Sequence, residues 1–394
     1  MTTPKVSVVM SVYNGMPFLE ASVRSILGQR EPDLELLVVD DGSTDAGPDL
    51  LREQSARDSR MRVLYRDENH GVAQSRNLAL HLAQGEYIAC QDADDISLDD
   101  RLAHQARCLD QNPSLGMVGT QVVFIGDDGE PIEGSRSRFP EKDSDIQIRL
   151  LESNCFCAGS VMMRREALER AGYYDQSMAP SEDYDLWLRL SEVAQMGNLA
   201  DVLYLYRQHS GSASSQNRWL QMHRKALALQ RAMVRRHGER LPFAVREAIA
   251  RDFLRAACLG AASGEIEGGK LSTTLALGEL DDARRSASLV EGIVLRYALG
   301  LWGEQASRNC ETLFQEVFPR RLPFSEVERR VRSRLSVEWL FGRPARGRGA
   351  DVDRRLWHAV RDDPRWLLNR AFWSVGLRNL SAVLRRTNRV TPED

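Results

Sequence analysis

The 394-residue sequence lacks several features that would place it in common classes of protein. It contains no uninterrupted run of about 18 apolar residues, which argues against a membrane-spanning helix. Its six cysteines are spread along the chain without a CxxC pair, which disfavours a disulfide framework and a cysteine metal site, including one at Cys155 and Cys157. No secretory signal precedes the first apolar segment. These absences predict a cytoplasmic protein.

Two further absences bear on particular folds. No GxGxxG motif follows the first predicted strand, which disfavours a dinucleotide-binding enzyme. A phosphoacceptor receiver domain also has an acid pair at a strand end, but it begins with that strand and needs a lysine at a later strand end. Here a complete strand–helix unit precedes the acid pair, and Lys142 is the only lysine in the relevant region. A receiver-type domain is therefore a poorly supported alternative.

Alternating strand and helix patterns fill the first third of the chain. Strands rich in β-branched residues and helices with apolar residues at helical spacing follow one another in βαβαβαβ order. This order predicts an α/β fold with a mainly parallel sheet flanked by helices, whose ligands bind at the carboxyl ends of the strands. The predicted strands cover residues 5–13, 34–40, 61–67 and 86–92, and the predicted helices cover 18–29 and 71–84.

The remaining sequence predicts a change of architecture near residue 215. Before it we expect a hairpin at 117–132, helices at 167–176 and 182–193, and a strand followed by a Ser/Gly loop at 198–215. After it the patterns are mostly helical. The domains predicted from the sequence are an α/β domain at 1–215, a helical region at 216–340, a Gly/Arg/Pro-rich linker at 341–351 and a basic helical tail at 352–394.

Three acidic clusters end a strand or begin a helix in the predicted α/β domain. They are Asp40 with Asp41 in VVDDGSTD, the run QDADD at 91–95, and SEDYD at 181–185. Carboxylates gathered at one place repel one another unless a cation or hydrogen-bond donors hold them. Oxygen ligands suit Mg²⁺ or Mn²⁺, which complete their coordination with substrate phosphates. Each cluster alone is also compatible with capping of turns and helices; the three together favour a nucleoside diphosphate site.

The ordered series of motifs resembles glycosyltransferase family 2, the non-processive enzymes of the GT-A fold. The resemblance covers residues 4–215 and is carried by VSVVMSVYNG, VVDDGSTD, NHGVAQSRNLAL, DADD followed by RL, SEDYDLWLRL and YRQH. Processive members carry a QxxRW motif and membrane spans. Residues 216–219 read QNRW, one residue short of that motif, so a processive synthase is not expected.

The resemblance also implies a role for individual residues. Asp183 matches the catalytic base of the family, and Asp94 and His209 match positions that bind the metal. Arg76 matches a position near the phosphates, although an ordinary surface arginine is an alternative. The residues that match positions around the nucleotide are Ser11, Tyr13, Asp41 and Asp92.

From these roles we expect metal-dependent, inverting transfer of a sugar from a nucleoside diphosphate sugar to a hydroxyl acceptor, with Mn²⁺ or Mg²⁺ as cofactor. The resemblance implies a sugar or lipid-linked acceptor and a product that enters a surface polysaccharide, lipopolysaccharide or glycolipid. One carboxylate is enough to deprotonate the acceptor hydroxyl in such a transfer. A catalytically inactive nucleotide-sugar-binding relative is the alternative, although none of the three acidic clusters is missing.

The end of the chain is basic, with 18 Arg against nine acidic residues from Arg320 to Asp394. Residues 366–386 have the pattern of a basic amphipathic helix, which predicts either peripheral contact with an anionic membrane or packing on the protein itself or on a second subunit. A homo-oligomer therefore remains open. Because arginines and acids are interleaved there, nucleic-acid binding is not expected.

Overall fold

The computed structural model describes residues 3–30, 33–209, 211, 217–280, 283–302, 305–318, 324–342, 359 and 361. The chain divides into two compact units. The first, here called the sheet unit, comprises residues 1–217 and 227–239; the second, the helical unit, comprises residues 218–226 and 240–394. Helix α8 (Arg218–His237) contributes residues to both units.

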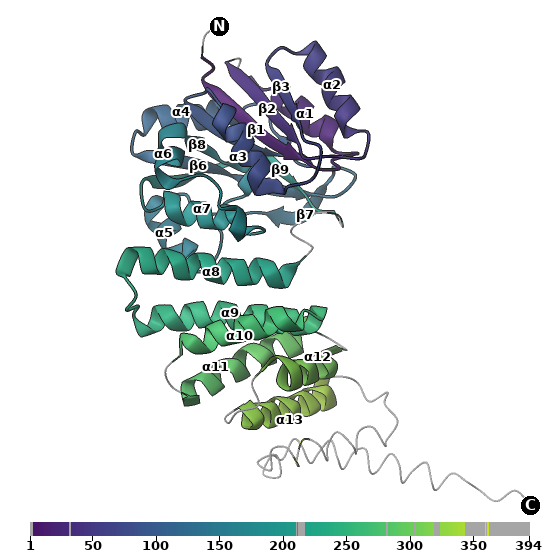
Figure 1. The fold of residues 1–394 in the computed structure, drawn as a ribbon, viewed down its shortest axis with the longest axis vertical. Coiled ribbons are helices and arrows are strands. Elements are labelled where there is room, and N and C mark those ends of the chain that lie inside the picture. Colours follow the sequence, from purple (N-terminus) through teal and green to yellow (C-terminus); the bar gives the residue numbers. More distant parts are fainter. Residues whose placement is uncertain are drawn as a thin grey trace, which may run out of the picture. The chain divides into compact units, whose positions relative to one another are not determined.

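Four neighbouring strands form the parallel half of the sheet, in the order β3-β2-β1-β4. Figure 1 labels the first three of them. The residues of β1 and β2 are buried on both faces of the sheet, as their near-continuous apolar sequences require, whereas the edge strand β3 is partly exposed. The bounds are β1 (Val6–Val12), β2 (Leu34–Asp40), β3 (Met61–Tyr65) and β4 (Tyr87–Asp92).

Beyond β4 the sheet is mixed. Strand β8 (Met162–Arg164) lies antiparallel between β4 and β6 (Leu115–Ile125), and β6 runs parallel to β9 (Gln195–Arg207). The short β5 (Ile96–Ser97) pairs with β9, and β7 (Pro131–Arg136) pairs with β6 as a hairpin. The parallel arrangement predicted from the sequence therefore holds for the four N-terminal strands, whereas the C-terminal strands form mixed pairs.

Helices follow the strands on both sides of the parallel half. Alternate residues of β1 and β2 form one core cluster with buried side chains of α1, α2 and α4, and α3 also contacts β1 and β2. The bounds are α1 (Leu19–Leu27), α2 (Gly47–Arg57), α3 (Val72–Leu82), α4 (Arg101–Gln111), α5 (Asp143–Leu150), α6 (Arg165–Ala171) and α7 (Glu182–Leu190), with 3₁₀ turns η1 (Ala158–Ser160) and η2 (Gln176–Met178).

The described part of the helical unit contains helices only. Helices α9 (Phe243–Ser263) and α10 (Ile266–Gly278) pack as a pair, and α11 (Ala283–Arg296) contacts α9 and α13 (Phe324–Gly342). Helix α11 continues into a π-helical turn, η4 (Tyr297–Leu301), and α12 (Ala306–Thr312) continues into a second one, η6 (Leu313–Val317).

The strands and helices expected in the first 215 residues are all present, with ends that differ by a few residues. The expected linker at 341–351 overlaps the end of α13, whose last two residues are Phe341 and Gly342. The predicted amphipathic segment at 366–386 lies outside the described residues. Among the described helices, none is long and apolar enough to cross a membrane.

Candidate active site

The carboxyl ends of β1, β2 and β4 bring the first two acidic clusters to one edge of the sheet. Strand register pairs Val12 of β1 with Asp40 and Ser11 with Asp92. In a parallel sheet, the residues that follow neighbouring strands open onto the same crevice, where ligands bind. Ser11 is partly exposed there, and Tyr13, just after the strand, is 50% exposed. Ser11 and Tyr13, two of the residues predicted to lie around the nucleotide, are therefore at this edge.

Asp41 is buried beside this edge and is held by the loop that precedes α3. Its carboxylate accepts hydrogen bonds from the backbone N–H groups of His70, at 3.2 Å, and Gly71, at 2.8 Å, and Arg66 lies 3.6 Å away. Gly71 has a φ of +91°, a conformation that glycine adopts at little cost and that ends the loop where α3 begins. The motif NHGVAQSRN thus fixes Asp41 in place, and its predicted contact with a nucleotide base stays a prediction.

Arg76 joins the second and third acidic clusters. Its guanidinium lies 2.5 Å from Asp92 and 3.5 Å from Glu182, and it stacks over the ring of Tyr174. Burial by itself lowers the pKa of Arg76, but the carboxylates of Asp92 and Glu182 outweigh it and raise that pKa well above its ordinary value. The arginine is therefore a permanent charge that connects the end of β4 to the start of α7. The alternative considered for Arg76 in the sequence, an ordinary surface arginine, is wrong, because the side chain is buried.

Asp92 is supported by two further side chains. Its backbone N–H lies 3.2 Å from the hydroxyl oxygen of Tyr204, and the fully buried Arg101 lies over the Tyr204 ring while donating to the carbonyls of Cys90 and Gly159. Burial raises the pKa of Asp92, and Arg76 opposes this shift without cancelling it. A Cβ at residue 159 would collide with Tyr204, so only glycine permits this close packing.

Asp94 and His209 meet although 115 residues separate them. Asp94 Oδ2 lies 2.9 Å from His209 Nε2, and the His209 ring packs against Phe18. The neighbouring Asp95 faces inward and accepts a hydrogen bond from the backbone N–H of Arg207, which anchors the end of β9. Burial, followed by the charges of Asp92 and Asp94, raises the pKa of Asp95 well above its ordinary range.

The Asp94–His209 pair fits one side of a divalent cation site. The two side chains are 32% and 19% exposed, and an open hollow of about 600 Å³ lies beside His209, lined by Gly126, Asp127, Asp128 and Gln208. Among the described residues no three His, Cys, Asp or Glu side chains form a closed metal cage. A carboxylate and an imidazole with open space beside them suit an ion that completes its coordination with substrate oxygens.

Asp183 lies in the first turn of α7, next to Glu182. Its Oδ2 accepts a hydrogen bond of 2.9 Å from the side-chain amide of Asn154, and its Oδ1 accepts one of 2.6 Å from the Tyr184 backbone N–H. Burial and the neighbouring Glu182 raise the pKa of Asp183 to about 7, against the opposing effect of these donors and of Arg76. A carboxylate with this pKa is suited to take a proton near neutral pH.

The structure thus brings together most of the residues predicted to act. Arg76 and Glu182 connect Asp92 to the helix that carries Asp183, Asp94 meets His209, and Ser11 pairs with Asp92. Sequence reasoning placed Glu182 in the third acidic cluster without giving it a role of its own, and it missed the supporting residues Asn154, Tyr204 and Arg101. For Arg101 the RL dipeptide after DADD was a usable signal, whereas Asn154 lies in a loop without any pattern that marks it.

Comparisons with known proteins identify the family of the chain. A protein-family model described as glycosyl transferase family 2 matches residues 7–172. A putative glycosyltransferase of Bacillus subtilis, EpsE, is 35% identical over 211 residues, which are 52% of this chain and 74% of that protein. The putative teichuronic acid biosynthesis glycosyltransferase TuaG of B. subtilis is 31% identical over 217 residues, 55% of this chain and 83% of TuaG.

Solved structures agree on the fold. S. aureus TarS 1-349, crystallised in complex with UDP-GlcNAc, superposes with a TM-score of 0.57 at 18% identity, covering 88% of this chain and 95% of that one. The sheet with its flanking helices is therefore a GT-A fold, as expected from the sequence. The chain belongs to glycosyltransferase family 2, and it is a glycosyltransferase.

Proposed function

We propose that this enzyme transfers a sugar, with inversion, from a nucleoside diphosphate sugar to a hydroxyl acceptor, and that Asp183 is the base. The observation that carries the proposal is the Asp92–Arg76–Glu182 bridge, which holds the base-bearing helix against the strand end where the nucleotide is expected. A base must lie beside the acceptor hydroxyl while the sugar's anomeric carbon is attacked, so a fixed distance between these two elements is a requirement of the reaction.

Each residue of the site has a separate role in the proposed reaction. Asn154 and the Tyr184 N–H orient the Asp183 carboxylate, leaving its remaining lone pairs to accept the acceptor's proton. Ser11, Tyr13, Asp41 and Asp92 contact the nucleoside, while Arg76 favours the ionised form of Asp92 and holds it in place. Asp94 and His209 would hold Mn²⁺ or Mg²⁺, which when bound offsets the charge of the departing diphosphate.

The product is proposed from the relatives rather than from the site. TuaG is named for teichuronic acid biosynthesis, and a TarS structure contains UDP-GlcNAc, so a surface polysaccharide and a UDP-sugar are the first candidates.

A lipid-linked acceptor would place the enzyme at a membrane surface. The basic segment at 366–386 is the proposed contact, and flotation with anionic liposomes of the full chain, compared with a chain ending before Asp351, tests it; equal flotation would contradict it.

The donor proposal is tested by calorimetric titration of the purified protein with UDP, GDP, dTDP and CDP, each with Mn²⁺ and with EDTA. We expect one nucleotide to bind in a metal-dependent manner, and the corresponding nucleotide sugars are then assayed for transfer. Metal-dependent nucleotide binding without transfer from any of the nucleotide sugars would favour the inactive nucleotide-sugar-binding relative, and absence of binding by every nucleotide would contradict the donor proposal.

A further inference from the structure

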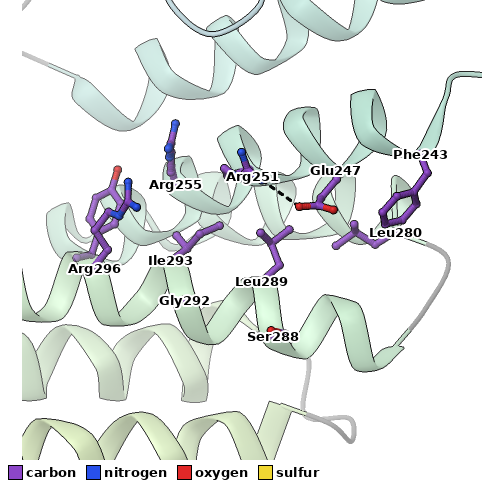
Figure 2. Close-up of a pocket in the computed structure, with 11 residues that line it drawn as sticks. Phe243, Glu247, Arg251, Arg255, Leu280, Ser288, Leu289, Gly292, Ile293 and Arg296 are labelled. Atoms are coloured by element: carbon purple, nitrogen blue, oxygen red, sulfur yellow. Dashed lines mark hydrogen bonds and ion pairs between the residues drawn. The ribbon is translucent and has the colours of Figure 1, made fainter.

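The helical unit contains a cavity of its own, separate from the strand ends that carry Asp92 and Asp94. It has a volume of about 640 Å³ and lies between α9 and α11, with the start of η4 at one end (Figure 2). This volume falls within the range of small-molecule sites. Neither the family match at residues 7–172 nor the proposed reaction uses any residue that lines it.

Positive charge dominates the polar part of the cavity. Arg251 and Arg255 come from α9 and Arg296 comes from the end of α11, against one glutamate, Glu247 (Figure 2). Arg251 lies 3.0 Å from Glu247, and Arg255 lies 2.8 Å from Asp252. No ion pair to another described residue accompanies the exposed Arg296. Because Arg251 and Arg255 each pair with a carboxylate, Arg296 is the cation placed to meet an anion.

Most of the remaining lining is apolar, with Ser288 and Tyr297 as its polar members. Phe243, Leu280, Leu289 and Ile293 form the apolar part, and the first three are only partly buried by the protein. Partly exposed aliphatic side chains beside arginines create a site that is apolar on one side and cationic on the other. A ligand that matches both parts carries an anionic head and an apolar substituent.

Two local features keep this site open. Gly292 lies inside α11, where glycine is a poor helix former, and a Cβ added there would meet no atom within 4 Å. The missing side chain thus leaves space on the cavity side. Directly after Arg296 the helix widens into the π-helical turn η4, and such turns occur frequently at functional sites.

We propose that this cavity binds a phosphate ester with an apolar substituent, the phosphate at Arg296 and Arg251 and the apolar part against Leu289 and Ile293. Guanidinium groups bind phosphate through paired hydrogen bonds, and a phosphate carries more charge than a carboxylate to attract a guanidinium. The proposal does not rest on the proposed sugar transfer, since every residue it uses belongs to the helical unit.

The test measures binding of decyl phosphate to the full chain by calorimetry, below its critical micelle concentration. Inorganic phosphate and decyl maltoside are the comparison ligands. Inorganic phosphate carries the anionic group without the decyl chain, and decyl maltoside carries the decyl chain without a charge. We expect decyl phosphate to bind at least about tenfold more tightly than either. Inorganic phosphate binding equally well would overturn the role of the apolar wall and indicate a free phosphate as the ligand.

Variants locate the binding in this cavity. Arg296→Gln removes the exposed cation, and Gly292→Leu fills the open space with a residue that favours helix; each is expected to weaken decyl phosphate binding about tenfold or more. Arg308→Gln changes an exposed arginine of α12 that does not line the cavity and is the matched control. Thermal unfolding checks that each variant is folded. Binding that is the same in all three variants and in the wild type would overturn the proposal.

Discussion

The two units of the chain differ in where most of their described ion pairs at the proposed site or on the helices are formed. In the sheet unit the buried Arg76 and Glu182 and the partly buried Asp92 meet from three different elements, α3, α7 and β4. In the helical unit most described ion pairs join residues three or four positions apart on one helix, such as Glu267 with Lys270, and remain exposed. Buried charges require mutual compensation, whereas solvated ones do not. The comparison indicates that charge in the sheet unit is retained for chemistry.

The largest effect should come from Asp183→Asn. The amide keeps the shape of the side chain but cannot accept the proton, so we expect the transfer rate to fall by roughly 10³-fold with donor affinity nearly unchanged. A transfer assay and a nucleotide titration measure the two quantities. Asp145→Asn, in an exposed position on α5, is the control and should remain active. An active Asp183→Asn enzyme would remove Asp183 from the mechanism.

Arg76→Met should show how far the sheet unit depends on its buried cation. The change leaves the partly buried Asp92 and the buried Glu182 without their shared partner, and we expect the free energy of unfolding to fall by about 3 kcal/mol. Urea denaturation measures it. Arg24→Met, which breaks an exposed pair with Glu20, is the matched control and should cost less than about 1 kcal/mol. Equal losses in the two variants would contradict the comparison between buried and exposed charge.

Asp94→Ala should weaken donor binding in the presence of Mn²⁺ by about 10–100-fold, because one of the two proposed ligands is lost. In EDTA the variant and the wild type should bind the nucleotide alike. Asp99→Ala, a nearby exposed position, controls for a general change of charge. If wild type and Asp94→Ala bind the donor equally in Mn²⁺, the assignment of the metal to Asp94 is wrong.

The pKa of Asp183, raised to about 7, predicts two pH dependences. Only the carboxylate accepts a proton, so kcat/KM should fall as the pH decreases through about 7. For stability the sign is opposite: the fold favours the protonated form, so this contribution is complete below the unfolded pKa and is lost as the pH rises to about 7.

Asp183→Asn should consequently unfold with a free energy higher than that of the wild type at pH 8, by on the order of 4 kcal/mol, and with a smaller advantage at pH 5. Urea titrations at the two pH values measure the difference. A stability difference that does not change with pH would show that Asp183 ionises in the folded protein as it does in water.

The smallest effect is expected in the helical unit. Glu267→Gln removes one partner of an exposed pair, in which Glu267 is 86% and Lys270 47% exposed, and should change the free energy of unfolding by less than about 0.5 kcal/mol. Lys225→Met, which leaves the buried Asp252 with one cation fewer, should cost more in the same urea assay. A larger loss from Glu267→Gln than from Lys225→Met would reverse the expected order.

Local patterns predicted the elements of the sheet unit well because its strands are apolar runs and its helices have one apolar face. The βαβ order also predicted that Asp40 and Asp92 would share an edge, since parallel strands place their carboxyl ends together. The mixed half of the sheet was not predictable in this way. Strand β6 pairs with β7, β8 and β9. The residues of β6 alone do not indicate on which side of the strand each neighbour lies.

The sequence by itself determined the order of the elements, the acidic clusters at their ends and the family to which they belong. Only the tertiary structure decided that Arg76 joins Asp92 to Glu182, that Asn154 holds Asp183, and that a cavity with Arg296 lies between α9 and α11. The physical reason is the separation along the chain over which each kind of interaction acts. Periodicity and turn chemistry act over a few residues, whereas these contacts join side chains from different elements, brought together only when the core packs.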